Sequence, residues 1–405
     1  MRCTWTPAVG FAIFTALAAC SSPSGPNEVA GTNPAPNAKD GGATPADAGA
    51  PAPAGDGGAK VTLSPVHFIG RFDTQNADGP RASWPGVQIR TRFSGTGATL
   101  RIRVAGTKNG TKTTFDQLDV SIDGAAPTIL KPTDATESYP IASGLPDSDH
   151  DVVVTKRTES FGMIQYLGID STEGRPLVPT PPPFSRYIEF VGDSITCGYG
   201  VLGANASCSF SADTESEPAA YAALTASALS AGHSSVAFSG IGMYRNSAGS
   251  TTDQMPVRFF RALAGDETSL WDFHITPDVV VVNLGANDYR SASVSGSLSA
   301  AFEEAYTSFL VKLREKYPQA YFIAALSSMM TESSSAGIKN RGPLKTSLTK
   351  IVQARTTAGD QRVSFFEFDE QSASDGYGCE NHPSQATQKR DSAKLVAYIK
   401  TLTGW

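Results

Sequence analysis

The sequence predicts two folded parts of different class: an all-β sandwich of jelly-roll type, then a three-layer α/β/α domain with a parallel central sheet. The first part, residues 61–178, alternates polar and apolar side chains in short runs separated by Gly, Pro, Asn and Asp, which is typical of antiparallel strands. The second part, residues 185–405, alternates apolar strand-like runs with helix-like segments, which indicates strand–helix–strand units. A Pro-rich stretch, residues 176–183, separates the two patterns.

Hydrophobic periodicity locates the individual elements. In the first part, strands are expected at residues 86–93, 98–104, 117–122 and 151–155. In the second part, strands are expected at residues 187–191, 235–238, 278–284, 321–325 and 363–368. Helices are expected at residues 218–229, 300–317, 344–355 and 384–402. Four successive valines at 279–282 indicate a strand buried on both faces, at the centre of the parallel sheet.

The N-terminal residues have the features of an export signal. In residues 1–20, Arg2 precedes an apolar run over residues 8–19 that is too short to span a bilayer. The ending Leu17-Ala18-Ala19-Cys20 resembles a bacterial lipobox, which implies cleavage before Cys20 and lipidation of its thiol; the alternative is an ordinary signal peptide with a chance Cys. Residues 21–60 have almost no large apolar side chain, so we expect a disordered Ala/Gly/Pro linker. The sequence thus predicts an exported bacterial lipoprotein of the cell envelope or cell surface, anchored to the membrane by its lipid.

Composition and charge exclude several classes of protein. Thirty-three Lys and Arg against 39 Asp and Glu give a net charge of −6, which argues against nucleic-acid binding. The sequence has no His pair at i, i+4, no Cys-x-x-Cys, no phosphate-binding loop and no dinucleotide fingerprint, so we expect neither a metal nor a cofactor. Cys197, Cys208 and Cys379 predict one disulfide and one free thiol, with the pairing open.

Four clusters of small and polar residues follow predicted strands, and the carboxyl ends of parallel strands meet at one edge of a sheet. The clusters contain Ser194, Gly240, Asn287 and His382. A serine hydrolase needs a hydroxyl nucleophile, an imidazole base and N–H donors for the oxyanion. Ser194 and His382 can supply the first two, and the Gly240 backbone amide with the Asn287 side chain can supply the donors. The alternatives are structural: a helix N-cap for Ser194, a turn for Asn287 and a surface position for His382.

The strings around these residues are GDSITCGYG, SGIGMYRN, NLGANDY and DGYGCENHPS. In this order they resemble the four sequence blocks of SGNH (GDSL-type) hydrolases, and most closely those of carbohydrate esterase family 2, which places a jelly roll before the hydrolase domain. Residues 84–95 resemble that first domain, and the resemblance covers residues 64–405. It implies removal of acetyl groups from polysaccharides such as xylan and mannan. It also implies an acetyl-enzyme on Ser194, His382 as base, and an oxyanion hole of Ser194, Gly240 and Asn287.

One position departs from the superfamily pattern, which has Asp three residues before the catalytic His. Cys379 occupies that position here. The resemblance therefore implies a Ser–His dyad with a backbone carbonyl on the other ring nitrogen, while Asp375 and Glu380 are nearby carboxylates that could substitute. Activity is expected to rise as His382 loses its proton, near the usual pKa of about 6.5.

Other residues of these strings are candidates for the substrate site. Gly240 and Gly242 are alternative oxyanion donors, of which we favour Gly240. Gly242, Tyr244, Arg245 and Tyr377 are candidate substrate-binding residues. Two other functions are kept as alternatives: an SGNH esterase or thioesterase acting on lipid or other acyl substrates, and a non-catalytic surface lipoprotein that binds carbohydrate.

Overall fold

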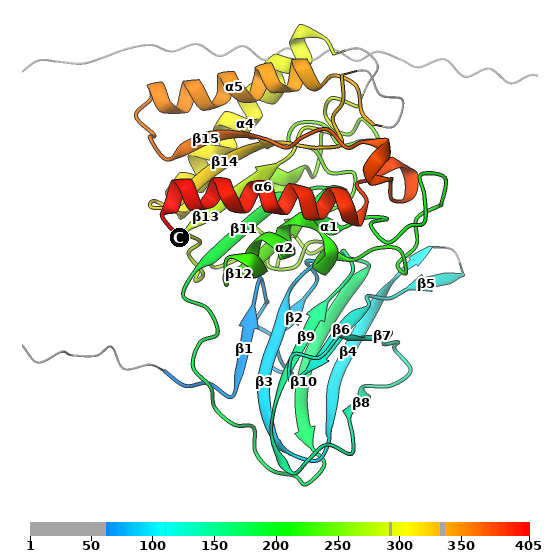
Figure 1. Ribbon diagram of the computed structural model, residues 1–405. Coiled ribbons are helices and arrows are strands. Elements are labelled where there is room, and N and C mark those ends of the chain that lie inside the picture. The colour runs from blue at the N-terminus through cyan, green and yellow to red at the C-terminus, as the bar shows by residue number, and fades with distance from the viewer. Residues whose placement is uncertain (1–61, 110, 291–293, 333–336) are drawn as a thin grey trace, which may run out of the picture. The chain divides into compact units, whose positions relative to one another are not determined.

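The computed structural model of the chain describes residues 62–405 apart from residues 110, 291–293 and 333–336. The expected signal peptide, the linker and Cys20 lie outside the described residues, so these expectations stay predictions. None of the helices in the described part of the chain combines the length and apolar character that a membrane-spanning helix requires. Figure 1 shows a β-sandwich followed by an α/β/α part.

The first part is a sandwich of two antiparallel sheets. One sheet has the strand order β1-β3-β9-β6-β7, and the other has the order β2-β10-β4-β5, with β8 also paired to β4. The strands are β1 (Val66–Ile69), β2 (Arg81–Ala82), β3 (Gln88–Gly95), β4 (Ala98–Asn109), β5 (Lys112–Thr114), β6 (Leu118–Ile122), β7 (Thr128–Leu130), β8 (Ser138–Ala142), β9 (Ser148–Lys156) and β10 (Gly162–Ser171). The four strands expected from the sequence correspond to β3, β4, β6 and β9.

The alternating pattern of the sequence builds the core of the sandwich. Along β3, buried and half-buried residues alternate, so Ile89 and Phe93 point into the core and their neighbours point outward. Leu100 of β4 belongs to the same core. The strands that the sequence did not reveal are five short ones and β10, in which a register shift between Tyr166 and Gly168 interrupts the alternation.

The second part contains one parallel sheet in the order β12-β11-β13-β14-β15. Its strands are β11 (Tyr187–Gly192), β12 (Gly232–Ala237), β13 (Val279–Asn283), β14 (Tyr321–Leu326) and β15 (Val363–Glu367). Its helices are α1 (Ser194–Cys197), α2 (Tyr221–Ala228), α3 (Met255–Arg258), α4 (Gly296–Lys316), α5 (Arg341–Thr357) and α6 (Gln385–Thr403), with short 3-10 turns η1 (Glu217–Ala219), η2 (Ala373–Asp375) and η3 (Cys379–Asn381). Every strand and helix expected in this part is present, and the predicted fold class is confirmed.

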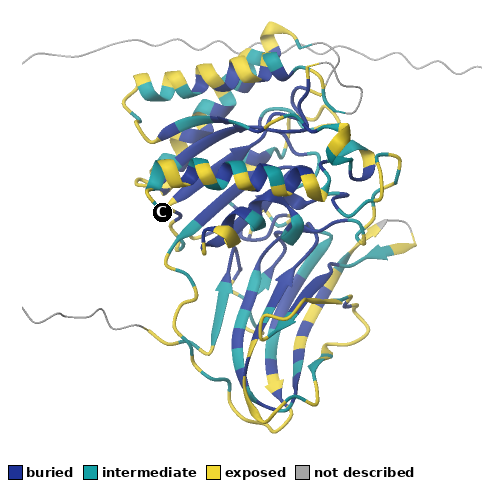
Figure 2. Cartoon of the chain, viewed as in Figure 1, coloured by how far each residue is buried: buried dark blue, intermediate teal, exposed yellow. Residues whose placement is uncertain are grey.

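Helices cover both faces of the parallel sheet, which gives three layers (Figure 1). The valines of β13 show why: Val279 and Val281 pack with α2 and α6, whereas Val280 and Val282 pack with α4 and α5. The strands of this sheet are mostly dark blue in Figure 2, as expected for a sheet buried on both faces. The strand order changes direction at β11, so the loops after β12 and β13 flank the loop after β11.

Buried polar contacts join the sandwich to the α/β/α part. The Arg71 guanidinium, which follows β1, donates to the Glu189 carboxylate of β11 at 2.7 Å, and both side chains are buried. Trp84 Nε1 donates to the backbone oxygen of Arg261 at 3.2 Å. Because a buried charge without its partner is strongly destabilising, these contacts fix the sandwich against the sheet that carries Ser194.

Candidate active site

Ser194 lies where β11 passes into α1, and its two preceding residues build that turn. A Cβ atom at Gly192 would lie 2.0 Å from Thr196 Oγ1, so glycine is the residue that fits there. Asp193 is the N-cap of α1, and its Oδ1 accepts a hydrogen bond from Ile195 N at 3.0 Å. The alternative that Ser194 serves as the N-cap is therefore wrong, and its hydroxyl is available at the carboxyl edge of the sheet.

His382 follows η3 and faces Ser194. Its Nε2 lies 2.9 Å from Ser194 Oγ, and its Nδ1 lies 3.2 Å from the backbone oxygen of Cys379. With Nδ1–H donating to this carbonyl, Nε2 is left to accept the Ser194 proton. The nearby carboxylates have other partners: Asp375 pairs with Arg390, and Glu380 accepts from the Tyr199 hydroxyl at 2.9 Å. A backbone carbonyl, and neither carboxylate, is thus the group at Nδ1.

Burial lowers the pKa of His382 to about 4, and the positive charge of Arg290 acts in the same direction. The hydrogen bond to the Cys379 carbonyl and the charge of Glu380 oppose this shift, but burial outweighs them. The value lies below the 6.5 expected from the sequence because the half-buried ring is desolvated and, among the described residues, no carboxylate hydrogen-bonds to it. His382 is therefore neutral, and able to accept a proton, throughout the neutral pH range.

The candidate oxyanion donors come from the two loops that flank Ser194. Gly240, after β12, has a φ of 76° and lines the same cavity as Ser194. Gly242 does not line this cavity, and its N–H donates to Asn246 Oδ1 at 2.9 Å. Asn287, after β13, donates through Nδ2 to Ile241 O at 2.8 Å and to Asp193 Oδ2 at 3.3 Å. Gly240 and Asn287 are therefore brought together at Ser194, and Gly242 is not.

A buried carboxylate shapes the loop that contains Gly240. Asp288 accepts the backbone N–H groups of Met243, Tyr244 and Arg245 at 2.9, 2.7 and 2.7 Å. Burial raises the pKa of Asp288, and the three N–H groups oppose that shift because they stabilise its ionised form. The chain turns around this carboxylate, which holds residues 243–245 away from the cavity.

A cavity of about 710 Å³ opens above Ser194 and His382. The substrate-binding candidates Gly242, Tyr244, Arg245 and Tyr377 are not among its lining residues. Lining residues that the sequence did not single out include Tyr199, Ser247, Arg290, Met329, Lys339 and Asn381. Tyr199 and Asn381 had a usable signal, since Tyr199 stands in the GDSITCGYG string and Asn381 stands directly before His382 in the DGYGCENHPS string.

A disulfide and an aromatic stack hold the loop of His382. Cys208 and Cys379 form the disulfide, and Cys197 is the free, buried thiol of the described chain, which settles the pairing left open by the sequence. The Tyr199 ring lies 4.2 Å from the His382 ring and is stacked on Phe210 at 4.0 Å. The residue whose carbonyl contacts His382 is thus covalently fastened to the segment that carries this stack.

Two family profiles match the chain in the order of its two parts. The profile of the carbohydrate esterase 2 N-terminal domain matches residues 68–181, and that of the GDSL-like lipase/acylhydrolase family matches residues 190–390. Both profiles agree with the architecture described above.

Curated relatives of the chain are bacterial esterases. The chain is 35% identical over 342 residues to the cellulase/esterase CelE of Acetivibrio thermocellus, a match that covers 84% of this chain and 40% of CelE. It is 26% identical over 360 residues to an acetylxylan esterase / glucomannan deacetylase of Cellvibrio japonicus, covering 84% of this chain and 92% of the relative. The chain thus spans less than half of CelE but nearly the whole of the second protein.

Solved structures give the same result at the level of the fold. A family two carbohydrate esterase from Clostridium thermocellum in complex with cellohexaose superposes with a TM-score of 0.76 at 33% identity, over 84% of this chain and 99% of that one. A carbohydrate esterase family 2 enzyme from Corynascus gives 0.73 at 30% identity, over 84% and 100%. With the paired jelly-roll and SGNH parts and the Ser194–His382 contact, these matches show that the chain belongs to carbohydrate esterase family 2.

Proposed function

We propose that this esterase removes O-acetyl groups from polysaccharides of the xylan or mannan type through an acetyl-enzyme on Ser194. The observation that carries the proposal is the 2.9 Å contact between His382 Nε2 and Ser194 Oγ at the base of an open cavity. The names of the Cellvibrio relatives, acetylxylan esterase / glucomannan deacetylase, support acetylated glycans as the substrate class.

The first half of the reaction transfers the acetyl group to the protein. His382 Nε2 takes the proton of Ser194 Oγ as this oxygen attacks the acetyl carbonyl, and the carbonyl oxygen becomes an oxyanion. The oxyanion is stabilised by the N–H groups of Ser194 and Gly240 and by Asn287 Nδ2. In the free protein Asn287 Nδ2 has a long contact of 3.3 Å to Asp193, which it can exchange for the oxyanion. The bond between the acetyl carbon and the sugar oxygen then breaks, and His382 donates the proton to this departing oxygen, which becomes a hydroxyl.

The second half of the reaction releases acetate. Water attacks the acetyl-Ser194 carbonyl, His382 accepts a proton from that water, and the same donors stabilise the second oxyanion. The bond to Ser194 Oγ breaks and the serine is reprotonated by His382. The Cys379 carbonyl keeps the imidazole in one tautomer through both halves, since it accepts from Nδ1–H.

Acetate release from acetylated xylan, acetylated glucomannan and para-nitrophenyl acetate tests the proposal. Ser194→Ala should lower kcat by about 10⁶-fold. Ser308→Ala is the control, because this serine is exposed on α4, is not among the lining residues of the cavity and should keep the activity. Preference for long acyl esters without release from glycans would instead favour a lipid or thioester hydrolase. Glycan binding with no ester cleavage would favour a carbohydrate-binding protein.

We further propose that the enzyme is exported and held at the cell envelope by a lipid on Cys20. The lipobox-like sequence before this residue supports the proposal. Labelled palmitate should be incorporated into the unchanged protein, and Cys20→Ala should release the protein in soluble form. Equal membrane association of both forms would contradict the anchor.

A further inference from the structure

The turn between β9 and β10 brings a carboxylate of the sandwich up to the active-site loops. Glu159 in this turn is 5% exposed, and its Oε2 accepts a hydrogen bond from the backbone N–H of Ser239 at 2.7 Å. The thiol of Cys197, the last residue of α1, lies 3.8 Å from the same oxygen. One oxygen atom of the sandwich therefore contacts both the loop after β12 and the helix that begins with Ser194.

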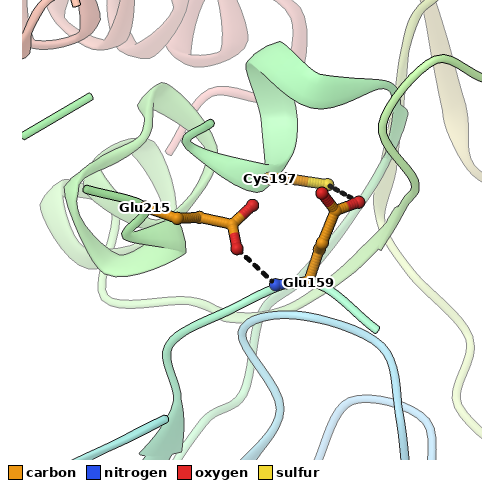
Figure 3. Close-up of side chains that lie close together, drawn as sticks. All are labelled: Glu159, Cys197 and Glu215. Carbon is orange, nitrogen blue, oxygen red and sulfur yellow. Dashed lines mark hydrogen bonds between the residues drawn. The ribbon is translucent and has the colours of Figure 1, made fainter. Parts of the chain in front are cut away.

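The surroundings of Glu159 hold it in one place. Figure 3 shows the Glu159 carboxylate beside the Cys197 thiol and the Glu159 backbone nitrogen beside Glu215, whose Oε2 accepts from this N–H at 3.0 Å. On the other side, Lys156 Nζ donates to the backbone oxygen of Glu159 at 2.8 Å. Burial raises the pKa of Glu159, so the position disfavours full charge, and a neutral amide oxygen can act as the acceptor in its place.

The contact with Ser239 matters because Gly240 comes next. The parallel register of β12 ends at Ala237, and beyond it the N–H of Ser239 finds its acceptor in Glu159. On the far side of Gly240, its backbone oxygen accepts from Ser247 N at 2.8 Å. The peptide that carries the Gly240 N–H therefore lies between two peptides that are each held, and this N–H makes no hydrogen bond to any other described residue.

We propose that Glu159 is a positioning residue for the oxyanion hole: from the sandwich, it fixes the direction of the Gly240 N–H relative to Ser194. This inference rests on the proposed function, because it concerns the donor assigned there. It gives the sandwich a part in the reaction that requires no contact between the sandwich and the substrate. Such a role is consistent with the cost of even a small displacement of a catalytic group.

The same cluster also offers a competing arrangement. Ligand atoms of Glu159, Cys197 and Glu215 lie within 4.8 Å of one another, close enough to hold a metal ion. A cation bound at Glu159 Oε2 would compete with the Ser239 N–H for that oxygen. The metal content of the purified protein is therefore part of the test.

The test compares two substitutions of Glu159 with a control in the same sandwich. Glu159→Met keeps most of the volume but has no oxygen acceptor, whereas Glu159→Gln keeps an acceptor. Asp119→Leu is the control, since Asp119 is a buried sandwich carboxylate whose hydrogen bonds in the described chain come from Arg157, at 2.8 and 3.1 Å. We expect Glu159→Met to lower kcat for para-nitrophenyl acetate by about 10- to 100-fold with KM changed less than about threefold.

We expect Glu159→Gln to recover kcat to within about threefold of the unchanged protein, and Asp119→Leu to lower Tm while keeping kcat per folded molecule. If Glu159→Met does not fold, Glu159→Ala at reduced temperature replaces it. The inference is wrong if Glu159→Met loses no more kcat than Asp119→Leu, or if Glu159→Gln is as impaired as Glu159→Met. A stoichiometric metal ion whose removal abolishes activity also overturns it. If the protein without any substitution cleaves no ester, the proposed function is wrong instead.

Discussion

The serine and the histidine of the proposed dyad are held in place by different chemistry. On the serine side, buried carboxylates organise the loops: Asp193 caps α1, and Asp288 accepts three backbone N–H groups. On the histidine side, the Cys379 carbonyl contacts Nδ1 of His382, the Tyr199 ring packs against the imidazole, and a disulfide fastens the loop.

This difference follows from what each side has to do. The loops around Ser194 converge with many backbone N–H groups, and a carboxylate can satisfy several of them at once. A carboxylate beside an imidazole does something else, because it stabilises the charged ring and raises its pKa. With a carbonyl instead of a carboxylate at Nδ1, burial is the dominant influence and lowers the pKa of His382 to about 4, although the hydrogen bond to the carbonyl opposes this shift. The protein thus uses carboxylates to hold the loops around Ser194, and the group that it places at Nδ1 of His382 is a backbone carbonyl.

Asn287→Ala disrupts the serine side and should have the largest effect of the substitutions that leave Ser194 and His382 in place. Loss of one oxyanion donor lowers kcat by about 10²–10³-fold. KM should change little, since the donor acts mainly on the transition state. Steady-state kinetics on para-nitrophenyl acetate, with Asn246→Ala as the control, measure this effect. An unchanged kcat in Asn287→Ala would remove Asn287 from the oxyanion hole.

Cys208→Ser attacks the histidine side without touching the Cys379 carbonyl. We expect kcat to fall by about tenfold, because the carbonyl that orients His382 loses its covalent attachment. The free energy of unfolding should fall by about 2–5 kcal/mol, as for other native disulfides. Thermal unfolding and kcat are measured with and without dithiothreitol. The reductant should affect the unchanged protein and have no further effect on Cys208→Ser; an unchanged kcat in both would show that the disulfide has no part in orienting His382.

The difference between the two sides also explains what the sequence could reveal. Ser194, Gly240 and Asn287 each follow a predicted strand of the sheet, so strand periodicity and the carboxyl-edge rule were enough to bring them together. His382 was found in the same way, after the last strand. What orients His382 could not be derived from the residues alone, because a backbone carbonyl leaves no side-chain signal in a sequence.

Contacts between distant segments account for the rest of what was missed. Glu159 stands in a turn of the sandwich, and nothing in its neighbourhood in the sequence indicates that it reaches Ser239. The candidates Tyr244 and Arg245 follow Gly240 closely in the sequence. Their backbone N–H groups, however, donate to Asp288, and neither residue lines the cavity. Position in the sequence therefore predicted which residues lie at the end of a strand, but it did not predict which residues of a turn face the cavity.

Tyr199→Leu tests the aromatic stack on the histidine side and should have a smaller effect. Aromatic pairs contribute about 0.5–1.5 kcal/mol beyond the area they bury, so we expect kcat to fall by roughly three- to tenfold. Tyr199→Phe is the matched control, because it keeps the ring and loses only the hydroxyl that donates to Glu380. If kcat falls equally in the leucine and phenylalanine variants, the hydroxyl, and not the aromatic stack, holds His382.

Arg290→Gln should have the smallest effect, which is a shift of the acid limb of the pH profile. His382 must be neutral to accept the Ser194 proton, so kcat/KM should fall as pH drops through its lowered pKa of about 4, well below 6.5. The positive charge of Arg290 disfavours the imidazolium, so its removal should raise this pKa and move the limb upward by about half a pH unit.

Lys339→Gln, which removes another cation lining the cavity, is the control. A limb that stays near 6.5 in every variant would mean that His382 titrates as an exposed histidine does, and the contrast between the two sides of the dyad would lose its electrostatic part.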